Sequence, residues 1–254
     1  MTASFAGRTA VVTGAGRGIG RATALGLADA GARVAVLARS QDELDEVAGT
    51  VRAAGGTALV IRADVGDPGQ LDEAAQRVGG ELGPVDVLVN NAAVVWPLGP
   101  TLSISREDWA TAVAVNVLAP VTLSALLVPA MVDRGWGRVV NVSSGIVAAP
   151  QTMPGGNAYA TTKSALEAHT RNLAEELAGT GVTVNVYRPG SVDTAMQAWI
   201  RSQSPDEIGA ALHQRFVRNH EQGAMLTPEH SAASLLRQLA GDGTGQIWAV
   251  DPAT

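Results

Sequence analysis

The sequence predicts a single doubly wound α/β domain over residues 1–254, in which helices cover both faces of a parallel sheet. Apolar runs of strand length alternate with helical patterns along almost the whole chain, which is typical of crossover connections between parallel strands. The composition agrees, because 46% of the 254 residues are hydrophobic and only 17% are charged. These values suit one domain with a large core.

About seven strands are expected from the apolar runs. Continuous apolar segments, such as the one at 85–89, suit a sheet that is buried on both faces. The predicted strands are Arg8–Thr13, Arg33–Leu37, Thr57–Ile61, Val85–Asn90, Arg138–Ser143, Val182–Arg188 and Gln246–Val250.

Five helices are expected between these strands. Gly31, Gly55 and Gly181 stand where helices should end, since glycine accepts the left-handed conformation that closes many helices. The predicted helices are Ile19–Asp29, Gln41–Ala53, Gly69–Glu81, Arg106–Val132 and Ala158–Ala178.

Two stretches depart from the regular pattern. Residues 110–132 carry no charge and so could be mistaken for a membrane span, but Asn116, Pro120 and Pro129 make a poor one. An apolar helix of this kind is expected in a core or a subunit interface. The segment 195–225 is long and mixed in character, so it is a candidate lid over a binding site.

Composition and charge exclude several classes of function. The net charge is −6 and no basic patch stands out, so nucleic acid is not an expected partner. The chain has no cysteine, and its four histidines are widely scattered, so neither thiolate chemistry nor a metal site is expected. Residues 1–7 lack a secretory signal pattern, which favours a cytoplasmic protein without membrane attachment.

A glycine-rich turn near the N-terminus predicts a dinucleotide site. It joins the first strand to the first helix, so its glycines allow a pyrophosphate to approach the backbone at a helix N-terminus. This context favours a Rossmann-type nucleotide fold over a simple turn. The residues assigned to this turn are Gly14, Gly16, Arg17, Gly18, Ile19 and Gly20.

The end of the second strand favours NADP(H) over NAD(H). No acidic residue precedes Asp42 there to bind a ribose 2′-hydroxyl, whereas Arg39 and the adjacent Ser40 could bind a 2′-phosphate. Arg17 would add a second positive charge. The alternative is that either arginine is a solvated surface residue.

Asp64 and Val65 follow the third strand. They are assigned to the adenine end of the site. The alternative for Asp64 is a turn or N-cap residue.

Several ordered motifs resemble the short-chain dehydrogenase/reductase family, in its compact single-domain branch. The resemblance covers residues 7–251, and its motifs are specific because they are numerous and correctly ordered. They are Thr13 to Gly20, Asn90-Asn91-Ala92-Ala93, Asn116, Ser143-Ser144, Tyr159 to Lys163, and Pro189-Gly190 followed by Thr194.

The resemblance implies a role for each polar residue of the proton-transfer set. Tyr159 would be the acid in ketone reduction, and Lys163, four residues later on the same helix face, would lower its pKa and bind the nicotinamide ribose. An ammonium about 4 Å away could supply the roughly 4 kcal/mol that this lowering requires. Ser144 would stabilise charge on the substrate carbonyl. The fifteen-residue step from Ser144 to Tyr159 predicts a bulged loop.

Asn116 would complete a water-linked proton relay to Lys163. A physical argument supports this implication, because Pro120 has no N–H and leaves the Asn116 carbonyl without its helical partner. The helix should therefore bend there. The alternative is a polar residue at a kink.

The remaining cofactor contacts are also implied by the resemblance. They are Asn91 after the fourth strand, and Pro189, Gly190, Val192 and Thr194 after the sixth. The sequence departs from the family pattern at Ala93, where glycine is usual.

We therefore expect an NADP(H)-dependent enzyme that reduces a small-molecule ketone or aldehyde, or oxidises a secondary alcohol. A non-catalytic nucleotide sensor and an epimerase or dehydratase on the same scaffold are the alternatives. Trp96, Met153, Met196 and Trp199 either line an apolar substrate pocket or fill the core. By resemblance, the charge-free helix and the helix at 158–178 imply a homotetramer or homodimer.

Overall fold

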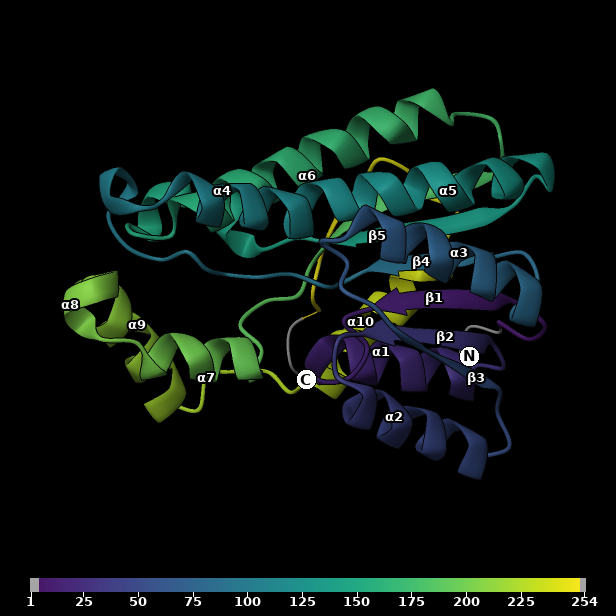
Figure 1. Ribbon diagram of the computed structural model, residues 1–254, viewed down its shortest axis with the longest axis horizontal. Helices are drawn as coiled ribbons and strands as arrows, with labels where there is room; N and C mark the ends of the chain where they lie inside the picture. The colour runs from purple at the N-terminus through teal and green to yellow at the C-terminus, as the bar shows by residue number, and fades with distance from the viewer. Residues whose placement is uncertain (1–4, 252–254) are drawn as a thin grey trace.

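The structure, a computed structural model, describes residues 5–251 and contains one seven-stranded parallel sheet (Figure 1). Residues 1–4 and 252–254 of the predicted domain lie outside the described residues. The strands are β1 (Thr9–Thr13), β2 (Arg33–Ala38), β3 (Ala58–Arg62), β4 (Val87–Asn90), β5 (Gly137–Val142), β6 (Val182–Arg188) and β7 (Ile247–Ala249).

The strand order is β3-β2-β1-β4-β5-β6-β7, which confirms the predicted doubly wound sheet. The order reverses at β1, where Val12 pairs with Val36 of β2 on one side and with Val89 of β4 on the other. In sheets of this kind ligands bind outside the carboxyl ends of the strands at the reversal point. The topology therefore places a binding crevice between the ends of β1 and β4.

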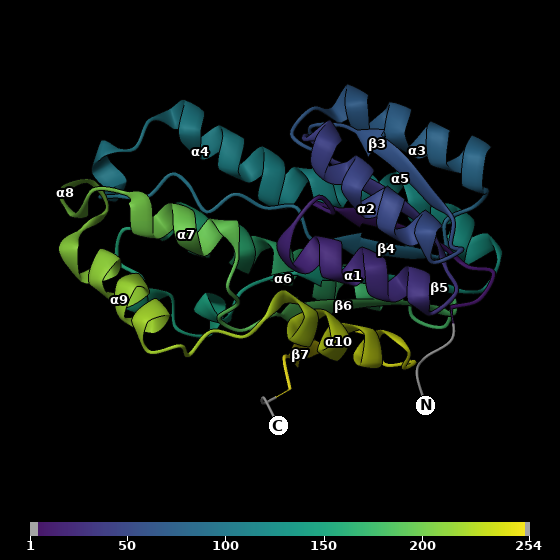
Figure 2. The same ribbon diagram turned by 90° about the horizontal axis from the view of Figure 1, so that it is seen from below.

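Helices cover both faces of the sheet and enclose two apolar cores (Figures 1 and 2). One face carries α1 (Gly18–Asp29), α2 (Gln41–Ala53) and α10 (Pro228–Leu239). The other carries α3 (Pro68–Leu82), α4 (Arg106–Val113), α5 (Ala119–Asp133) and α6 (Asn157–Glu176). Burial on both faces explains why the strands are almost uninterrupted apolar runs.

The predicted long helix at 106–132 is not one regular helix. A π-helical turn at Ala114–Leu118 separates α4 from α5, and it ends two residues before Pro120. The expected irregularity is confirmed, because proline cannot donate a hydrogen bond to the preceding turn. The segment Arg106–Asp133 is long and apolar enough to cross a membrane, but half of its most apolar window is buried inside the fold.

The predicted lid segment forms three helices that project beyond the sheet: α7 (Ala195–Ser202), α8 (Pro205–Ile208) and α9 (Ala210–Glu221) (Figures 1 and 2). Its two ends meet, because Val192 and Leu226 form a parallel bridge and Asp193 N donates to Leu226 O at 2.9 Å. The helices enclose a third, smaller apolar cluster that includes Ile208 and Phe216.

Helix α10 was not predicted from the sequence. Its start carries a recognisable signal, since Thr227 caps the helix by accepting a hydrogen bond from His230 N, and Pro228 occupies the first turn. The capping pattern would have located this helix, which then packs along α1 on the face of the sheet.

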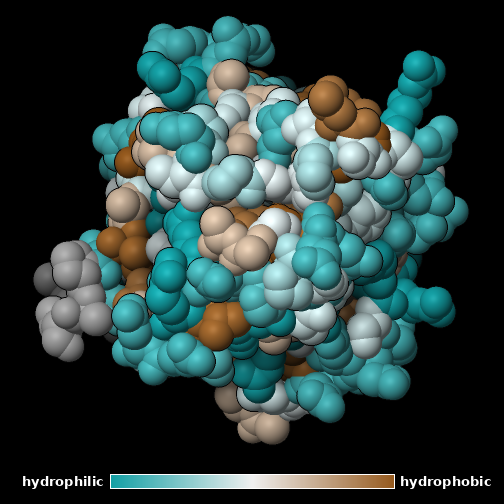
Figure 3. Space-filling model, turned by 90° about the vertical axis from the view of Figure 1, so that its left-hand side faces the viewer, coloured by the Kyte–Doolittle hydropathy of each residue, from teal (hydrophilic) through white to brown (hydrophobic). Residues whose placement is uncertain are grey.

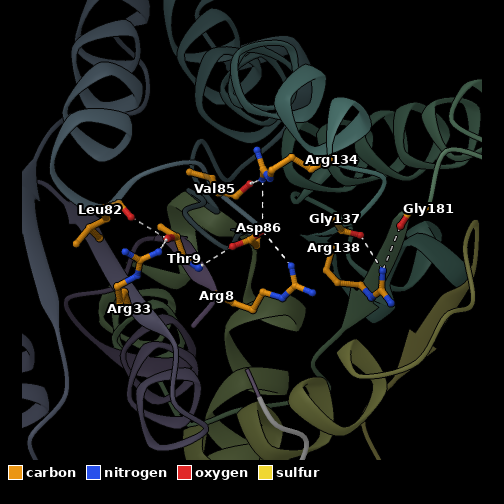
Figure 4. Close-up of polar contacts among 10 residues, drawn as sticks. All are labelled: Arg8, Thr9, Arg33, Leu82, Val85, Asp86, Arg134, Gly137, Arg138 and Gly181. Carbon is orange, nitrogen blue, oxygen red and sulfur yellow. Dashed lines mark hydrogen bonds and ion pairs between the residues drawn. The ribbon is translucent and has the colours of Figure 1, made fainter. Parts of the chain in front are cut away.

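A cluster of charged side chains lies where the parallel strands begin, which is called the amino edge of the sheet below (Figure 4). The opposite end, where the strands finish, is called the carboxyl edge. Asp86, just before β4, accepts hydrogen bonds from Thr9 N at 2.9 Å, Arg8 Nη1 at 3.3 Å and Arg134 Nη2 at 3.4 Å. Trp136 lies beneath two guanidinium groups, with the Cζ atoms of Arg8 and Arg138 at 3.7 Å and 4.5 Å from its ring centroid. The cluster therefore ties the starts of β1, β4 and β5 together.

Candidate active site

A cleft of about 800 Å³ runs along the carboxyl ends of the strands and beneath the lid helices. It brings together nearly all of the residues that the sequence predicted for the site. Those that line it are Gly14, Gly16, Arg17, Gly18, Ile19, Arg39, Ser40, Asp64, Val65, Asn91, Ser144, Tyr159, Lys163, Pro189, Gly190, Val192 and Thr194. Gly20 and Asn116 do not line the cleft but lie behind its wall.

The glycine turn is held close to the neighbouring backbone. A Cβ atom at Gly20 would lie 2.2 Å from the carbonyl oxygen of Gly14, and Gly14 itself has a φ of 63°. Neither position accepts a larger residue, because one lacks space and the other requires a left-handed conformation. Gly20 therefore supports the turn from within, while Gly14 faces the cleft.

The amino end of α1 is suited to bind an anion. Its N-cap residue, Arg17, makes no side-chain capping hydrogen bond, and no acidic residue stands in the first turn. The free N–H groups and the helix dipole would favour a pyrophosphate here. Thr194 lies beside this point, since a Cβ atom at Gly18 would be 3.3 Å from its methyl carbon.

Asn91 has a structural contact as well as a position in the cleft. Its Nδ2 donates to the carbonyl of Thr13 at 2.9 Å, and its backbone N–H donates to the Thr13 hydroxyl at 3.0 Å. The side chain thus joins the ends of β1 and β4 directly below the glycine turn. Sequence reasoning had assigned it to the cofactor alone.

The two arginines proposed for a 2′-phosphate each have an acidic neighbour. Arg39 Nη1 lies 4.0 Å from Asp64 Oδ2, and Arg17 Nη1 lies 3.4 Å from Glu43 Oε1. Both arginines are exposed, so neither ion pair contributes much to stability. Glu43 also lines the cleft. The sequence analysis missed it because it lies inside a helix rather than in a motif.

Tyr159 and Lys163 both face the cleft, but the electrostatics differ from the expectation. Lys163 Nζ is 6.0 Å from the ring centroid of Tyr159 and donates to the carbonyl oxygen of Val142 at 2.7 Å. Burial raises the pKa of the Tyr159 phenol, and the neighbouring Ser144 hydroxyl only partly opposes this effect. In the protein chain by itself desolvation dominates, so the predicted lowering of the phenol pKa by Lys163 together with a bound coenzyme stays a prediction.

Lys163 is itself strongly affected by burial. Desolvation lowers the pKa of its ammonium to about 8, while the negative charge of Glu167 acts in the opposite direction. The side chain lies within the fold and is only 2% exposed. The ammonium form still predominates at neutral pH, so the site holds a proton on both Tyr159 and Lys163.

Glu167 connects three elements around the site, and the sequence analysis did not identify it. Its carboxylate accepts from the Ser143 hydroxyl at 2.7 Å and from Arg188 Nε and Nη2 at 2.9 Å and 2.7 Å. It therefore links α6 to the ends of β5 and β6. This bidentate pair, in which Glu167 is buried and Arg188 partly buried, fixes the strand end that leads into Pro189.

Ser144 stands where β5 gives way to an irregular loop. Its hydroxyl oxygen accepts from the backbone N–H of Ile146 at 3.3 Å, and short 3₁₀ turns follow at Gly145–Ala148 and Pro150–Thr152. Gly155 has a φ of 86°, and its carbonyl oxygen accepts from Gly99 N. The predicted bulged loop between Ser144 and Tyr159 is confirmed.

Asn116 is fully buried in the π-helical turn. Its Oδ1 accepts from Val94 N at 2.9 Å, and its Nδ2 donates to Val94 O at 2.8 Å and to the Thr162 hydroxyl at 3.0 Å. The amide therefore joins α6, next to Lys163, to the segment that follows β4. The relay through its backbone carbonyl stays a prediction.

The lid half of the cleft is mainly apolar. Trp96, Met153, Met196 and Trp199 all line it, which favours the substrate-pocket interpretation over core filling. Hydrophobic side chains are visible between hydrophilic ones on this side of the molecule (Figure 3). Trp199 keeps 36% of its surface exposed. An organic substrate with an apolar body would fit this wall.

Comparisons with known proteins identify the family. A family model described as short chain dehydrogenase matches residues 8–205. The chain is 38% identical over 204 residues to the 2,3-dihydro-2,3-dihydroxybenzoate dehydrogenase of Bacillus subtilis, and this match covers 80% of the chain and 76% of that protein.

Two solved structures share the fold over almost the whole chain. One is described as a candidate NAD(P)-dependent gluconate 5-dehydrogenase from Beutenbergia cavernae with bound NADP; it is 37% identical, with a TM-score of 0.85 and coverage of 99% of this chain and 98% of that one. The other is L-sorbose reductase from Gluconobacter frateurii with NADPH and L-sorbose, which is 27% identical, with a TM-score of 0.87 and coverage of 99% and 97%.

Proposed function

The chain belongs to the short-chain dehydrogenase/reductase family of NAD(P)-dependent oxidoreductases, and we propose that it uses NADP(H) to interconvert a carbonyl and a secondary alcohol. The observation that carries the proposal is the convergence of Ser144, Tyr159 and Lys163 on the same cleft as the glycine turn. A sensor protein would not need this proton-transfer set beside the nucleotide site.

The residues of the cleft fit a dinucleotide. Gly14 and Gly20 allow the tight turn that precedes α1, and the uncapped amino end of α1 offers N–H donors to a pyrophosphate. Arg39 and Ser40 would hold a 2′-phosphate, Asp64 and Val65 would border the adenine, and Thr194 would approach the phosphates. A bound nicotinamide coenzyme supplies or accepts the hydride.

Each catalytic side chain has a proposed role. The Tyr159 phenol, which is protonated at neutral pH because its pKa is raised, donates its proton to the forming alkoxide. The Ser144 hydroxyl donates a hydrogen bond to the same oxygen and stabilises its developing charge. The Lys163 ammonium binds the nicotinamide ribose and assists the phenol in the direction of alcohol oxidation, where Tyr159 must act as a base.

The relatives support the cofactor and the type of substrate. NADP or NADPH is bound in both of the solved structures described above, and one of them also holds a sugar ketone, L-sorbose. These observations support a preference for NADP(H) and a small-molecule carbonyl or alcohol substrate. The lid 195–225 would close over that substrate as part of the single domain 1–254.

The test is NADPH oxidation, followed by absorbance, with a panel of prochiral ketones. We expect at least one ketone to be reduced, and Tyr159→Phe to lower kcat by about 10²–10⁴-fold, because general acid catalysis is worth that factor. Thr161→Val is the control, since Thr161 is an exposed residue of the same helix. Undiminished turnover by Tyr159→Phe would argue for a different proton donor.

We also propose a cytoplasmic homotetramer or homodimer. In the charge-free helix, Leu118 is 54% exposed and Leu126 is 39% exposed, so this helix offers apolar side chains to a partner subunit. Sedimentation at micromolar concentration tests this proposal, and a monomer under those conditions would contradict it.

A further inference from the structure

The lid places a single charged side chain in the wall of the cleft. Among the described residues of the lid segment 195–225, only Arg215 is both charged and part of the lining. Its Nη1 donates to the backbone carbonyl of Thr152 at 2.6 Å. Arg201, the other lid arginine near this wall, pairs with Asp193 instead and does not line the cleft.

Most N–H donors of the Arg215 guanidinium have no hydrogen-bond partner within the described residues. It has five N–H donors in a planar fork, and the contact with Thr152 is its one hydrogen bond within the described part of the chain. It forms no ion pair there, although the chain carries a net charge of −6. Arg215 is an exposed residue of the lining, and a cation without a counter-ion beside a largely apolar wall is suited to a negatively charged ligand.

Asn219 extends this group of donors. It lies four residues after Arg215 on α9, so the two side chains share one face of the helix, and both line the cleft. Phe216 lies between them in sequence and also lines the cleft, where it joins the apolar cluster under the lid. A fork and an amide above an apolar surface match a carboxylate attached to a hydrocarbon body.

The position of Arg215 also relates it to the reacting groups. Thr152 belongs to the loop that connects Ser144 with Tyr159, so Arg215 joins the lid to this loop. A carboxylate bound by Arg215 would lie beside that loop while the rest of the molecule extends over the apolar wall. The other basic residues of the cleft lining are less suited to bind this carboxylate. Lys163 is buried, and Arg17 and Arg39 lie at the opposite end of the cleft, beside the glycine turn.

We propose that the substrate is an oxo acid or hydroxy acid, whose carboxylate binds Arg215 and Asn219 while its carbonyl or hydroxyl group faces Ser144 and Tyr159. This inference rests on the proposed function, since it names the substrate class of the same site. It states that the lid favours negatively charged substrates over neutral ones.

The experiment compares two ketones that share the acetylphenyl group but differ in charge, para-acetylbenzoate and its methyl ester, with NADPH as reductant. We expect kcat/KM to be about tenfold or more higher for the carboxylate, because it gains charge-assisted hydrogen bonds. Arg215→Gln should remove this advantage mainly through KM and leave the ester unaffected. Arg218→Gln is the matched control, since Arg218 is exposed on the same helix and does not line the cleft.

A binding measurement separates this inference from the proposed function. Calorimetry of the NADPH-loaded protein should detect benzoate more readily than benzamide, and Arg215→Gln should abolish the difference. Equal use of acid and ester, or an equal loss of both in Arg215→Gln, would overturn the inference and leave Arg215 as a support for the Thr152 loop. If no ketone of any charge is reduced, the proposed function fails, while the benzoate titration still decides the role of Arg215.

Discussion

The amino edge and the carboxyl edge of the sheet both carry buried ionisable side chains, but these differ in how they are paired. At the amino edge, the carboxylate of Asp86 is surrounded by Arg8, Arg134 and the Thr9 amide, and its side chain is only 10% exposed (Figure 4). At the carboxyl edge, Lys163 is buried with one carbonyl partner, and the Tyr159 phenol is desolvated. The buried carboxylate at the amino edge is paired with arginines, whereas the buried Lys163 ammonium at the carboxyl edge has a backbone carbonyl as its hydrogen-bond partner and is destabilised by desolvation.

This difference separates stability from chemistry within one fold. Paired charges that hold strands together stabilise the native state, while groups with perturbed protonation are typical of functional sites. A site that must change its protonation during a reaction cannot also optimise stability. The comparison therefore predicts that substitutions at the two edges have opposite effects on stability and on activity.

The largest effect on stability is expected for Asp86→Ala. It leaves Arg8 and Arg134 without their carboxylate and Thr9 N without its acceptor, so the free energy of unfolding should fall by about 3 kcal/mol. Urea denaturation measures this loss. Steady-state kinetics at low temperature should show an unchanged KM, because the cluster lies at the edge opposite to the cleft.

An exposed ion pair provides the control for this substitution. Arg77 and Glu81 are each about half exposed, so Glu81→Gln should change the unfolding free energy by less than about 0.5 kcal/mol. If Asp86→Ala were as mild as Glu81→Gln, the amino edge would not be the stabilising region that the comparison requires.

Lys163→Met is expected to act in the opposite direction. Below about pH 8 the lysine is charged in both the folded and unfolded states, and its burial costs up to about 3 kcal/mol, because its pKa falls from 10.5 to about 8. Methionine avoids this cost but leaves the Val142 carbonyl without its donor, which offsets part of the gain. The variant should therefore be inactive but more stable than the parent by about 2 kcal/mol at pH 7.

The pH dependence tests the cause of this gain. Between about pH 8 and pH 10.5 the unfolded chain keeps the Lys163 proton while the folded chain loses it, so the stability of the parent rises with pH in this window. Lys163→Met lacks this contribution, and its advantage should disappear by about pH 10. Denaturation curves for both proteins from pH 7 to pH 10 measure the difference. A constant gap across that range would show that desolvation of Lys163 is not its source.

The residues at the two edges of the sheet were not equally predictable from the sequence. The carboxyl edge could be predicted because glycines at 14 and 20, and the spacing of Tyr159 and Lys163, follow from local backbone geometry. The amino edge could not, since Arg8, Asp86 and Arg134 come from distant segments that only the folded sheet brings together. Asp86 had been assigned to the interior of a strand, whereas β4 begins one residue later, at Val87.

The substrate half of the site was only partly predictable for a related reason. The lid segment was located from the break in the strand–helix pattern, but its three helices and the positions of Arg215 and Asn219 depend on how they pack over the cleft. Glu43 and Glu167 were missed because each lies inside a helix, where a charged residue is ordinarily a solvated one. Packing, rather than local pattern, decides which helical charges face the site.

The smallest expected effect concerns the choice of coenzyme. It tests whether arginines at the carboxyl edge bind the 2′-phosphate of NADPH. Arg39→Gln should lower kcat/KM for NADPH about tenfold, the value of one charge-assisted hydrogen bond, and leave NADH nearly unchanged. Glu43→Gln should raise NADPH use severalfold, because Arg17 then loses its competing carboxylate. Kinetics with both coenzymes measure these ratios. If Arg39→Gln weakened both coenzymes equally, the arginine would act on the shared part of the dinucleotide, and the pairing of Arg39 with Asp64 would be structural like that at the opposite edge.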